Sequence, residues 1–221
     1  MPVGAMTALP LPANGTWLAF HGQMLVRPAE DWQPEGDAVY KAGGLYAFDL
    51  EGFRQTGKIG AVDMLAEPGE RSAIAEFASN RDHVFVLFNE NVRGRVMAFE
   101  KSAAGWTGRR LALPEGGTIT MNHANEAGAS VSFTYEDLLT PPTLYWSDDN
   151  GETLAPILAQ KAFFDASSHA AEQFEAISKD GTRIPYFVAR PKDQTAPVPA
   201  IIYGYGGFEE TMAPWYSGMR G

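Results

Sequence analysis

The sequence predicts a mainly β protein whose short strands are arranged as part of a β-propeller. Runs of aromatic and β-branched residues recur up to about residue 160, bounded by Gly, Pro, Asn and Asp, and helix signals are scarce. The runs form three sets of four that begin near residues 16, 73 and 118. Successive four-stranded units of about 40–50 residues are typical of propeller blades. A β-sandwich is the rival all-β architecture for this pattern.

Each set is predicted to be built from neighbouring antiparallel strands. The first set contains residues 16–20, 23–27, 44–50 and a weaker run ending at 61–65. The second set contains residues 73–78, 83–88, 95–100 and 109–113. The third set contains residues 118–122, 130–135, 143–147 and 153–159. One side of the hairpin around the turn NENVRG is predicted to carry Phe85, Leu87, Val96 and Ala98.

The third set ends with a polar turn, SDDNGET, at residues 147–153. Ser147, Asp149, Gly151 and Thr153 fit the S-x-D-x-G-x-T pattern of the Asp-box hairpin found in sialidase-type propellers. Leu154 stands where that pattern normally has tryptophan, and the sequence holds no second copy. Ordinary hairpin chemistry accounts for such a turn, and the ligand register of an EF-hand loop is not met. We therefore expect a structural turn.

The residue pattern of the sequence changes after about residue 162. Two strands, at 173–178 and 182–190, flank Asp180-Gly181, which is a strong hairpin-turn signal. The run AIIYGYGG at 200–207 is nearly continuous in apolar residues, which predicts a strand buried on both faces. A domain boundary is expected near residue 170, with one domain at 1–170 and the start of another at 171–221.

Composition and charge exclude several classes of function. Lys and Arg number 17 against 27 Asp and Glu, a net charge of −10, which argues against nucleic acid or an anionic membrane as partner. The absence of cysteine excludes a disulfide framework and a thiolate nucleophile. The first residues lack the basic region of a signal peptide, and no run approaches the roughly 18 apolar residues of a membrane span. We expect a cytoplasmic rather than a periplasmic protein.

The residues that carry chemistry in many enzymes are scattered here. The four histidines, each expected at a strand end or in a loop, are His21, His83, His123 and His169. None has the spacing of a metal site, and we expect no metal or other cofactor. A nucleophile elbow of the form G-x-S-x-G is also missing, because neither Ser130 nor Ser217 has a glycine two positions away on both sides.

The glycine-rich stretch YGYGGF at 203–208 admits several interpretations. A phosphate loop would need a G-K-[ST] ending, and a dinucleotide fingerprint would need a third glycine and a helix. An oxyanion-hole loop after the third strand of an α/β-hydrolase would suit a glycine-rich strand end, because the backbone must approach the substrate carbonyl. The remaining alternative is that the glycines only turn the chain.

Two motifs together resemble the prolyl oligopeptidase family of serine peptidases. SKDGTRIPYF at 178–187 is followed by IIYGYGGFEETMAPWYS at 201–217, and this order is similar to the start of that family's catalytic domain. The stretches HVFVLFNENVRGRV, FTYEDLLTPPTLYW and KAFFDASSHAAEQFEA are similar to its last propeller blades and domain junction. The resemblance implies a seven-bladed propeller capping an α/β-hydrolase domain that cleaves short peptides after proline.

The resemblance also assigns residues by position. Tyr205 matches the tyrosine whose hydroxyl completes the oxyanion hole, and Phe208 matches a phenylalanine that lines the substrate pocket. The glycines that shape this turn correspond to Gly204, Gly206 and Gly207. Tyr203 and Glu209 receive no role.

The family's nucleophilic serine, aspartate and histidine are expected beyond residue 221, and a whole propeller needs about four further blades. We therefore expect an internal fragment: a partial propeller of about three blades, then the first strands of an α/β-hydrolase domain, inactive alone. The expected partners of the parent protein, itself expected to be monomeric, are short proline-containing peptides, while the fragment is expected to self-associate through open strand edges. The alternative is a non-catalytic β-propeller module that binds peptides or a protein.

Overall fold

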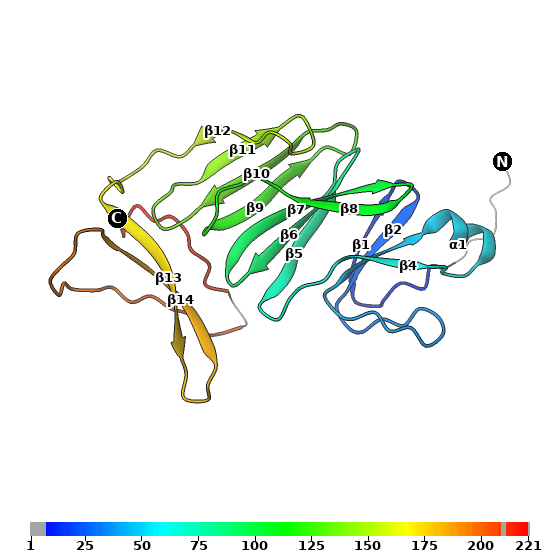
Figure 1. Ribbon diagram of the computed structural model, residues 1–221, viewed down its shortest axis with the longest axis horizontal. Helices are drawn as coiled ribbons and strands as arrows, with labels where there is room; N and C mark the ends of the chain where they lie inside the picture. The colour runs from blue at the N-terminus through cyan, green and yellow to red at the C-terminus, as the bar shows by residue number, and fades with distance from the viewer. Residues whose placement is uncertain (1–7, 209–210, 221) are drawn as a thin grey trace.

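The structure is a computed structural model that describes residues 8–208 and 211–220, and it consists largely of antiparallel β-sheet (Figure 1). The described residues form three four-stranded sheets and one two-stranded sheet. In each four-stranded sheet, strands consecutive in the sequence are paired side by side. The three predicted sets of four strands are confirmed, and the sheets are called blades 1, 2 and 3.

Apart from the fourth strand of blade 2, the strand bounds follow the predicted runs closely. Blade 1 contains β1 (Gly15–Phe20), β2 (Gln23–Pro28), β3 (Leu45–Asp49) and β4 (Val62–Ala66). Blade 2 contains β5 (Ser72–Ser79), β6 (Val84–Glu90), β7 (Arg93–Ser102) and β8 (Gly105–Arg110). Blade 3 contains β9 (Thr118–Ala124), β10 (Val131–Glu136), β11 (Thr143–Ser147) and β12 (Ala155–Ala159).

The fourth strand of blade 2 lies earlier than predicted. The run 109–113 was expected to form it, but β8 pairs with β7 from a tight turn in which Ser102 faces Gly105. Gly105 has a φ of 118°, which an L side chain rarely adopts, so the reversal is placed at this glycine. Leu111, whose N–H still donates to the carbonyl of Val96 in β7, and Leu113 follow the strand and are buried between blades 2 and 3.

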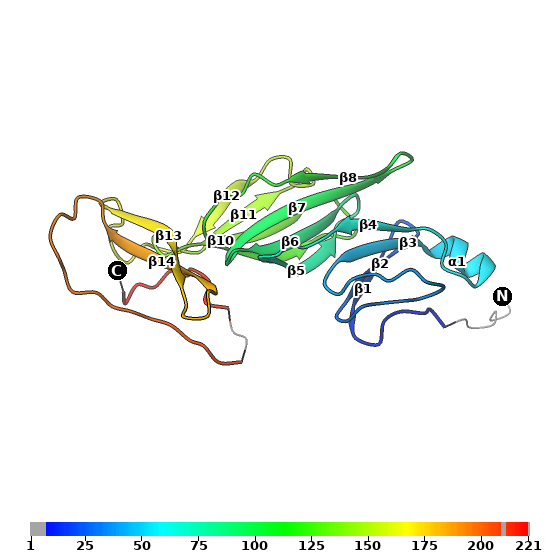
Figure 2. The same ribbon diagram turned by 60° about the horizontal axis from the view of Figure 1, so that its bottom comes forward.

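Two of the three hydrophobic cores of the described residues lie between the blades, and the third packs blade 1 against Trp32 and Phe53. The three blades follow one another across the molecule (Figure 2). One core joins blades 1 and 2, and a second joins blades 2 and 3. Strand β6 contributes to both, because Val84 and Val86 face blade 1 whereas Phe85 and Leu87 face blade 3. Its near-continuous apolar sequence therefore reflects burial on both faces. Three sheets stacked in series, each sharing a core with the next, show that the sandwich alternative is wrong and that the partial propeller is correct.

The predicted hairpin face in blade 2 is confirmed, since its four apolar residues all belong to the core shared with blade 3: Phe85, Leu87, Val96 and Ala98.

A short helix, α1 (Leu50–Thr56), interrupts blade 1 between β3 and β4 and was not predicted. The side chain of Asp49 caps it by accepting a hydrogen bond of 3.0 Å from the backbone N–H of Glu51. Gly57 ends it in a left-handed conformation, and the ring of Phe53 packs against Phe48 at 6.4 Å. Within the described ranges, no helix is long and apolar enough to cross a membrane.

After blade 3 the chain forms a separate hairpin of β13 (His169–Ile177) and β14 (Arg183–Pro191). The turn is the predicted one, because Gly181 has a φ of 87° and Asp180 accepts a 3.0 Å hydrogen bond from the N–H of Thr182. The hairpin begins where a domain boundary was expected, near residue 170, but the division into domains stays a prediction.

The strand expected at 200–207 is wrong. This segment forms no strand, and its apolar side chains are open to solvent, with Ile202 95% exposed. A strand needs a neighbour to pair its backbone groups, and none of the described strands lies beside this segment in any sheet. The chain instead runs irregularly from β14 past the hairpin and turns back toward blade 3 (Figures 1 and 2).

Candidate functional site

The predicted site residues lie in this irregular segment. Tyr205 is half-exposed and Phe208 is 95% exposed, with a left-handed φ of 56° at Phe208. A Cβ added at Gly204 or Gly206 would meet nothing within 4 Å, so the backbone approaches no other group at these two glycines. The expected roles of Tyr205, Phe208 and the three glycines stay predictions. Glu209, which had no assigned role, lies outside the described residues, as do the first seven residues.

Tyr203, which also had no predicted role, takes part in an aromatic clamp on Arg220. The guanidinium carbon of Arg220 lies 4.1 Å from the centre of the Tyr203 ring and 4.4 Å from that of Trp215. A guanidinium within about 6 Å of a ring face is attracted by the ring's quadrupole. The clamp therefore ties the residue two places before Tyr205 to the end of the described chain.

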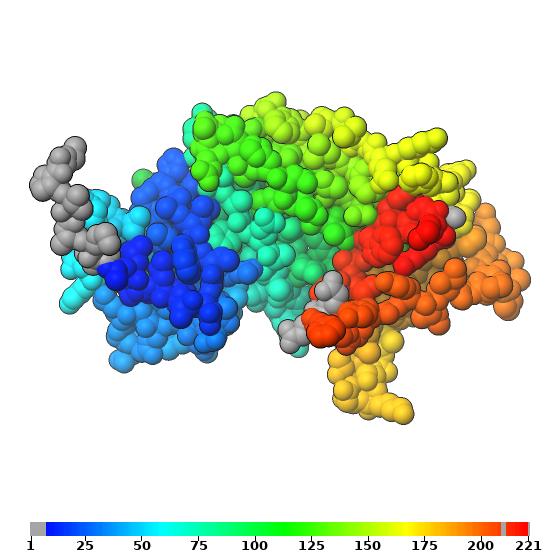
Figure 3. Space-filling model, turned by 180° about the vertical axis from the view of Figure 1, so that it is seen from behind, coloured from blue at the N-terminus to red at the C-terminus, as the bar shows by residue number. Residues whose placement is uncertain are grey.

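The stretch after the site, residues 211–220, docks on blade 3. The hydroxyl of Thr118 donates to the carbonyl of Pro214 at 2.6 Å, and the N–H of Tyr216 donates to Oε2 of Glu136 at 2.9 Å. Tyr216 is 7% exposed, far less than Phe208. Figure 3 shows this stretch, in red, lying against the rest of the molecule.

The linker after blade 3 also contacts Tyr216. The N–H of Phe163 donates to the Tyr216 hydroxyl at 2.8 Å, and the ring of Phe164 stacks on that of Tyr216 with centroids 5.2 Å apart and planes 9° apart. An aromatic ring buried with its hydroxyl hydrogen-bonded is well anchored. No periodic pattern in the sequence predicts this docking, since Tyr216 and Glu136 are 80 positions apart.

The hairpin of β13 and β14 docks on blade 2 through polar side chains. Gln173 donates from Nε2 to the carbonyl of Asn91 at 2.8 Å, in the turn between β6 and β7. Glu175 forms ion pairs with Arg71 of the loop before β5 and, at 3.0 Å, with Arg183 of β14. Hydrogen bonds from Arg71 and then Arg183 hold the pKa of Glu175 below its ordinary value. The hairpin and residues 211–220 thus attach to adjacent blades.

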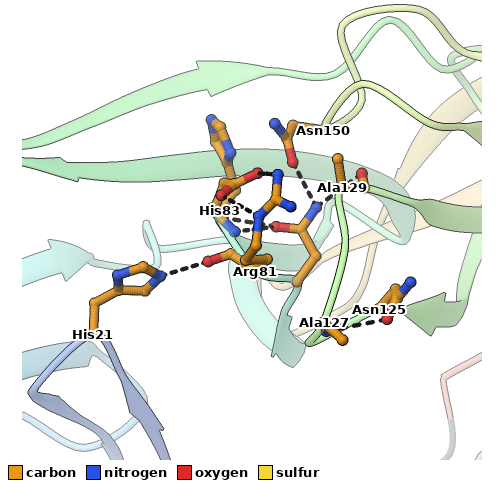
Figure 4. A network of polar contacts seen from close by, with 9 residues as sticks. His21, Arg81, His83, Asn125, Ala127, Ala129 and Asn150 are labelled. Atoms are coloured by element: carbon orange, nitrogen blue, oxygen red, sulfur yellow. Dashed lines mark hydrogen bonds and ion pairs between the residues drawn. The ribbon is translucent and has the colours of Figure 1, made fainter.

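A buried polar junction fixes the three blades relative to one another (Figure 4). Asn80 is 2% exposed and its amide is fully paired: Oδ1 accepts from the N–H groups of Asp82 and His83, and Nδ2 donates to Ala129 and Asn150. Blade 1 joins through Nε2 of His21, which donates to the carbonyl of Arg81. The junction links turns of all three blades, so its role is structural.

The SDDNGET turn belongs to the same junction. Ser147 Oγ accepts from the N–H of Gly151 at 2.8 Å and donates to Asp149 at 2.6 Å, and Asp149 accepts from the N–H of Thr153 at 2.9 Å. These bonds, led by that from Ser147, lower the pKa of Asp149 to about 2. Arg109 of blade 2 donates to the carbonyl of Asn150 at 2.7 Å. The predicted structural turn is confirmed.

The histidines lie where they were expected, in turns or near strand ends. His21 is in the β1–β2 turn, His83 precedes β6, His123 is near the end of β9 and His169 begins β13. Burial, with a smaller contribution from nearby Arg109, lowers the pKa of His83. Across the described part of the chain, His, Asp and Glu side chains form no group of three or more suited to a metal ion.

Three antiparallel meanders that stack in series through shared cores define a section of a β-propeller. Residues 45–160 match the family model described as the prolyl oligopeptidase N-terminal beta-propeller domain. The chain belongs to the prolyl oligopeptidase family, and the predicted resemblance is thereby confirmed.

Individual relatives agree with this assignment. The chain is 31% identical over 216 residues to the uncharacterized peptidase y4nA of Sinorhizobium fredii, covering 96% of this chain and 30% of that protein. It is 25% identical over 158 residues to a prolyl endopeptidase of Elizabethkingia miricola, covering 70% of this chain and 22% of that protein. The solved structure of a post-proline cleaving enzyme from Rickettsia typhi superposes with a TM-score of 0.74 at 26% identity, over 94% of this chain and 30% of that one. The chain thus spans less than a third of these relatives.

Proposed function

We propose that this chain is the propeller-to-peptidase section of a serine peptidase that hydrolyses short proline-containing peptides by acyl transfer. The observation that carries the proposal is the position of YGYGGF: it follows the family's propeller section and the β13–β14 hairpin, and its continuation docks on blade 3. The prolyl endopeptidase and post-proline cleaving enzyme among the relatives support proline as the specificity.

In this proposal Tyr205 stabilises the oxyanion. Attack of a serine on the peptide carbonyl places negative charge on the carbonyl oxygen, and a positioned O–H donor stabilises that charge. The Tyr205 side chain is half-exposed, so a substrate can reach its hydroxyl. One such donor is typically worth about 3–4 kcal/mol of transition-state stabilisation.

Phe208 supplies apolar contact to the substrate. Its side chain is 95% exposed, and covering an aromatic ring of this kind with the apolar ring of a proline removes apolar surface from water. The exposure of Phe208 is therefore consistent with a surface that a peptide completes.

The attacking serine is proposed to lie outside these 221 residues. The sequence contains no G-x-S-x-G elbow, and the relatives are more than three times as long as the part of them that matches. Residues 1–221 alone are therefore proposed to be inactive.

A chromogenic Gly-Pro substrate tests this division of labour. Purified 1–221 is expected to release no chromophore above a buffer blank, whereas the complete protein is expected to turn the substrate over and to lose activity with a serine-directed inhibitor. Inhibitor-sensitive turnover by 1–221 would contradict the proposed absence of the nucleophile. Saturable peptide binding by the complete protein without any turnover would favour the non-catalytic binding module instead.

A further inference from the structure

We propose that blade 3 positions the oxyanion donor, with Tyr216 as the positioning residue that transmits the blade's position to Tyr205. The inference deepens the proposed function and rests on it for the role of Tyr205. It is carried by three independent observations: a paired docking site at one end of blade 3, a rigid base beneath it, and a clamp that closes the chain on both sides of the site.

The docking site is defined by the strand register. Thr118, the first residue of β9, and Glu136, the last of β10, are direct cross-strand partners. Their side chains hold successive parts of the same stretch, since Thr118 donates to Pro214 and Glu136 accepts from Tyr216. Because the ladder fixes the spacing of the two strands, it also fixes where residues 214–216 lie.

The base beneath the docking site is itself tied down. The hydroxyl of Tyr135, which is buried beside Glu136, lies 2.8 Å from the carbonyl of Glu115 and 2.8 Å from Oδ2 of Asp137. The other oxygen of Asp137 accepts from the N–H groups of Leu139 and Thr140, each at 2.7 Å. Burial first, and the bond to Asp137 second, raise the pKa of Tyr135, so its hydroxyl remains protonated. This end of blade 3 is therefore a rigid support.

The clamp closes the chain around the candidate site. The guanidinium of Arg220 lies against the rings of both Tyr203 and Trp215. It therefore links the chain just before the site to the docked stretch after it. Tyr205 and Phe208 lie between these two attachments in the sequence. The site residues themselves stay exposed, while the chain on either side of them is held.

In this proposal the propeller helps to set the position of the Tyr205 hydroxyl relative to the substrate carbonyl. A donor displaced by about 1 Å can lose about 10²-fold in rate, so an anchor of this kind acts on kcat. A shift of blade 3 relative to the peptidase part would move Tyr205 with it.

Spin-label distances test the anchor without relying on activity. The chain has no native cysteine, so Gly206→Cys and Glu126→Cys give two unique labels, and a Cβ at position 206 meets nothing within 4 Å. Glu126 is exposed in the turn at the far end of β9. Measured in the complete protein, with any cysteine outside residues 1–221 replaced by serine, the pair is expected to give a narrow distance distribution that broadens with Tyr216→Ala.

Matched variants keep this test sharp if Tyr216→Ala folds poorly. Thr118→Val removes only the hydroxyl bond to Pro214 and is expected to broaden the distribution in the same direction, whereas Thr120→Val, exposed on the same strand, is expected to leave it unchanged. A distribution that stays narrow in both Tyr216→Ala and Thr118→Val would overturn the anchor.

Kinetics of the complete protein test the coupling to Tyr205. Tyr216→Ala is expected to lower kcat about 10- to 100-fold with little change in KM, and to have almost no further effect once Tyr205→Phe is present. Equal losses in the presence and absence of the Tyr205 hydroxyl would overturn the coupling. An unchanged kcat in Tyr205→Phe alone would remove the proposed oxyanion role, while the spin-label distances would still decide the anchor.

Discussion

Two apolar runs of this chain, β6 in blade 2 and residues 200–203 near the C-terminal end, have similar sequences and opposite fates. The run VFVLF becomes a strand buried on both faces, with Phe85 at 0% exposure. The run AIIY remains irregular and open to solvent. Strand β6 has β5 and β7 as ladder partners and a blade on each side, whereas the second run has no partner among the described strands. Apolar character alone therefore does not make a strand, because pairing and coverage must also be present.

The two regions differ in what they contribute to the protein. The blades carry the shared cores, and the segment after β14 carries exposed apolar side chains and the candidate site. Large exposed apolar groups commonly mark surfaces that bind something. Substitutions in the two regions should therefore separate stability from activity.

The largest expected difference in the free energy of unfolding is between alanine substitutions at two phenylalanines. Phe85→Ala is expected to lower the free energy of unfolding by about 3–5 kcal/mol, because it empties part of the core between blades 2 and 3. Phe208→Ala, the same change at a 95% exposed side chain, is expected to change it by less than about 0.5 kcal/mol. Urea unfolding followed by tryptophan fluorescence measures both free energies, and similar losses for the two variants would show that the Phe208 ring is packed rather than exposed.

A smaller difference, in the acid dependence of stability, is expected between two turns that contain an aspartate. One turn lies in blade 3 and the other in the β13–β14 hairpin. The pKa of Asp149 is lowered to about 2 and that of Asp180 is also lowered, chiefly by hydrogen bonds from Ser147 and from the N–H of Thr182 respectively. Because the folded-state pKa lies below the unfolded value of 3.8, each carboxylate contributes stability above that pH which is lost as the pH falls through the folded value.

Asp149→Asn should therefore remove more of the acid dependence of stability than Asp180→Asn, because the first turn also binds blade 2 through Asn150. Unfolding midpoints recorded from about pH 6 to about pH 2 check this order. If the two variants flatten the profile of stability against pH equally, the attachment of the Asp149 turn to blade 2 adds nothing to the acid dependence.

The fold was predictable from the sequence wherever local patterns and pairing agree. The strands of the blades follow alternation and turn residues, and the Asp180-Gly181 hairpin follows its turn chemistry. Helix α1 was missed because it has only 7 residues, and its capping by Asp49 and Gly57 is a weak signal inside a β-rich stretch. The β8 shift was missed because Leu111 and Leu113 are as apolar as a strand yet serve the core between the blades.

The candidate site was predictable only in part. Its residues were found from a motif, but their setting depends on tertiary contacts that no local pattern reports, such as Tyr216 with Glu136 and Tyr203 with Arg220. The strand expected through 200–207 failed for the same reason, since its formation depends on neighbours rather than on its own composition.

The central claim is that the exposed glycine-rich segment supplies the oxyanion donor. The most direct test compares kcat for Tyr205→Phe and Tyr203→Phe in the complete protein on a proline-containing peptide. Each variant loses one tyrosine hydroxyl, and the two positions are only two residues apart. The Tyr203 variant keeps the ring that contacts Arg220. Tyr205→Phe is expected to lower kcat about 10²- to 10³-fold and Tyr203→Phe to leave it nearly unchanged. Equal kcat values for Tyr205→Phe and the unsubstituted protein would contradict the account.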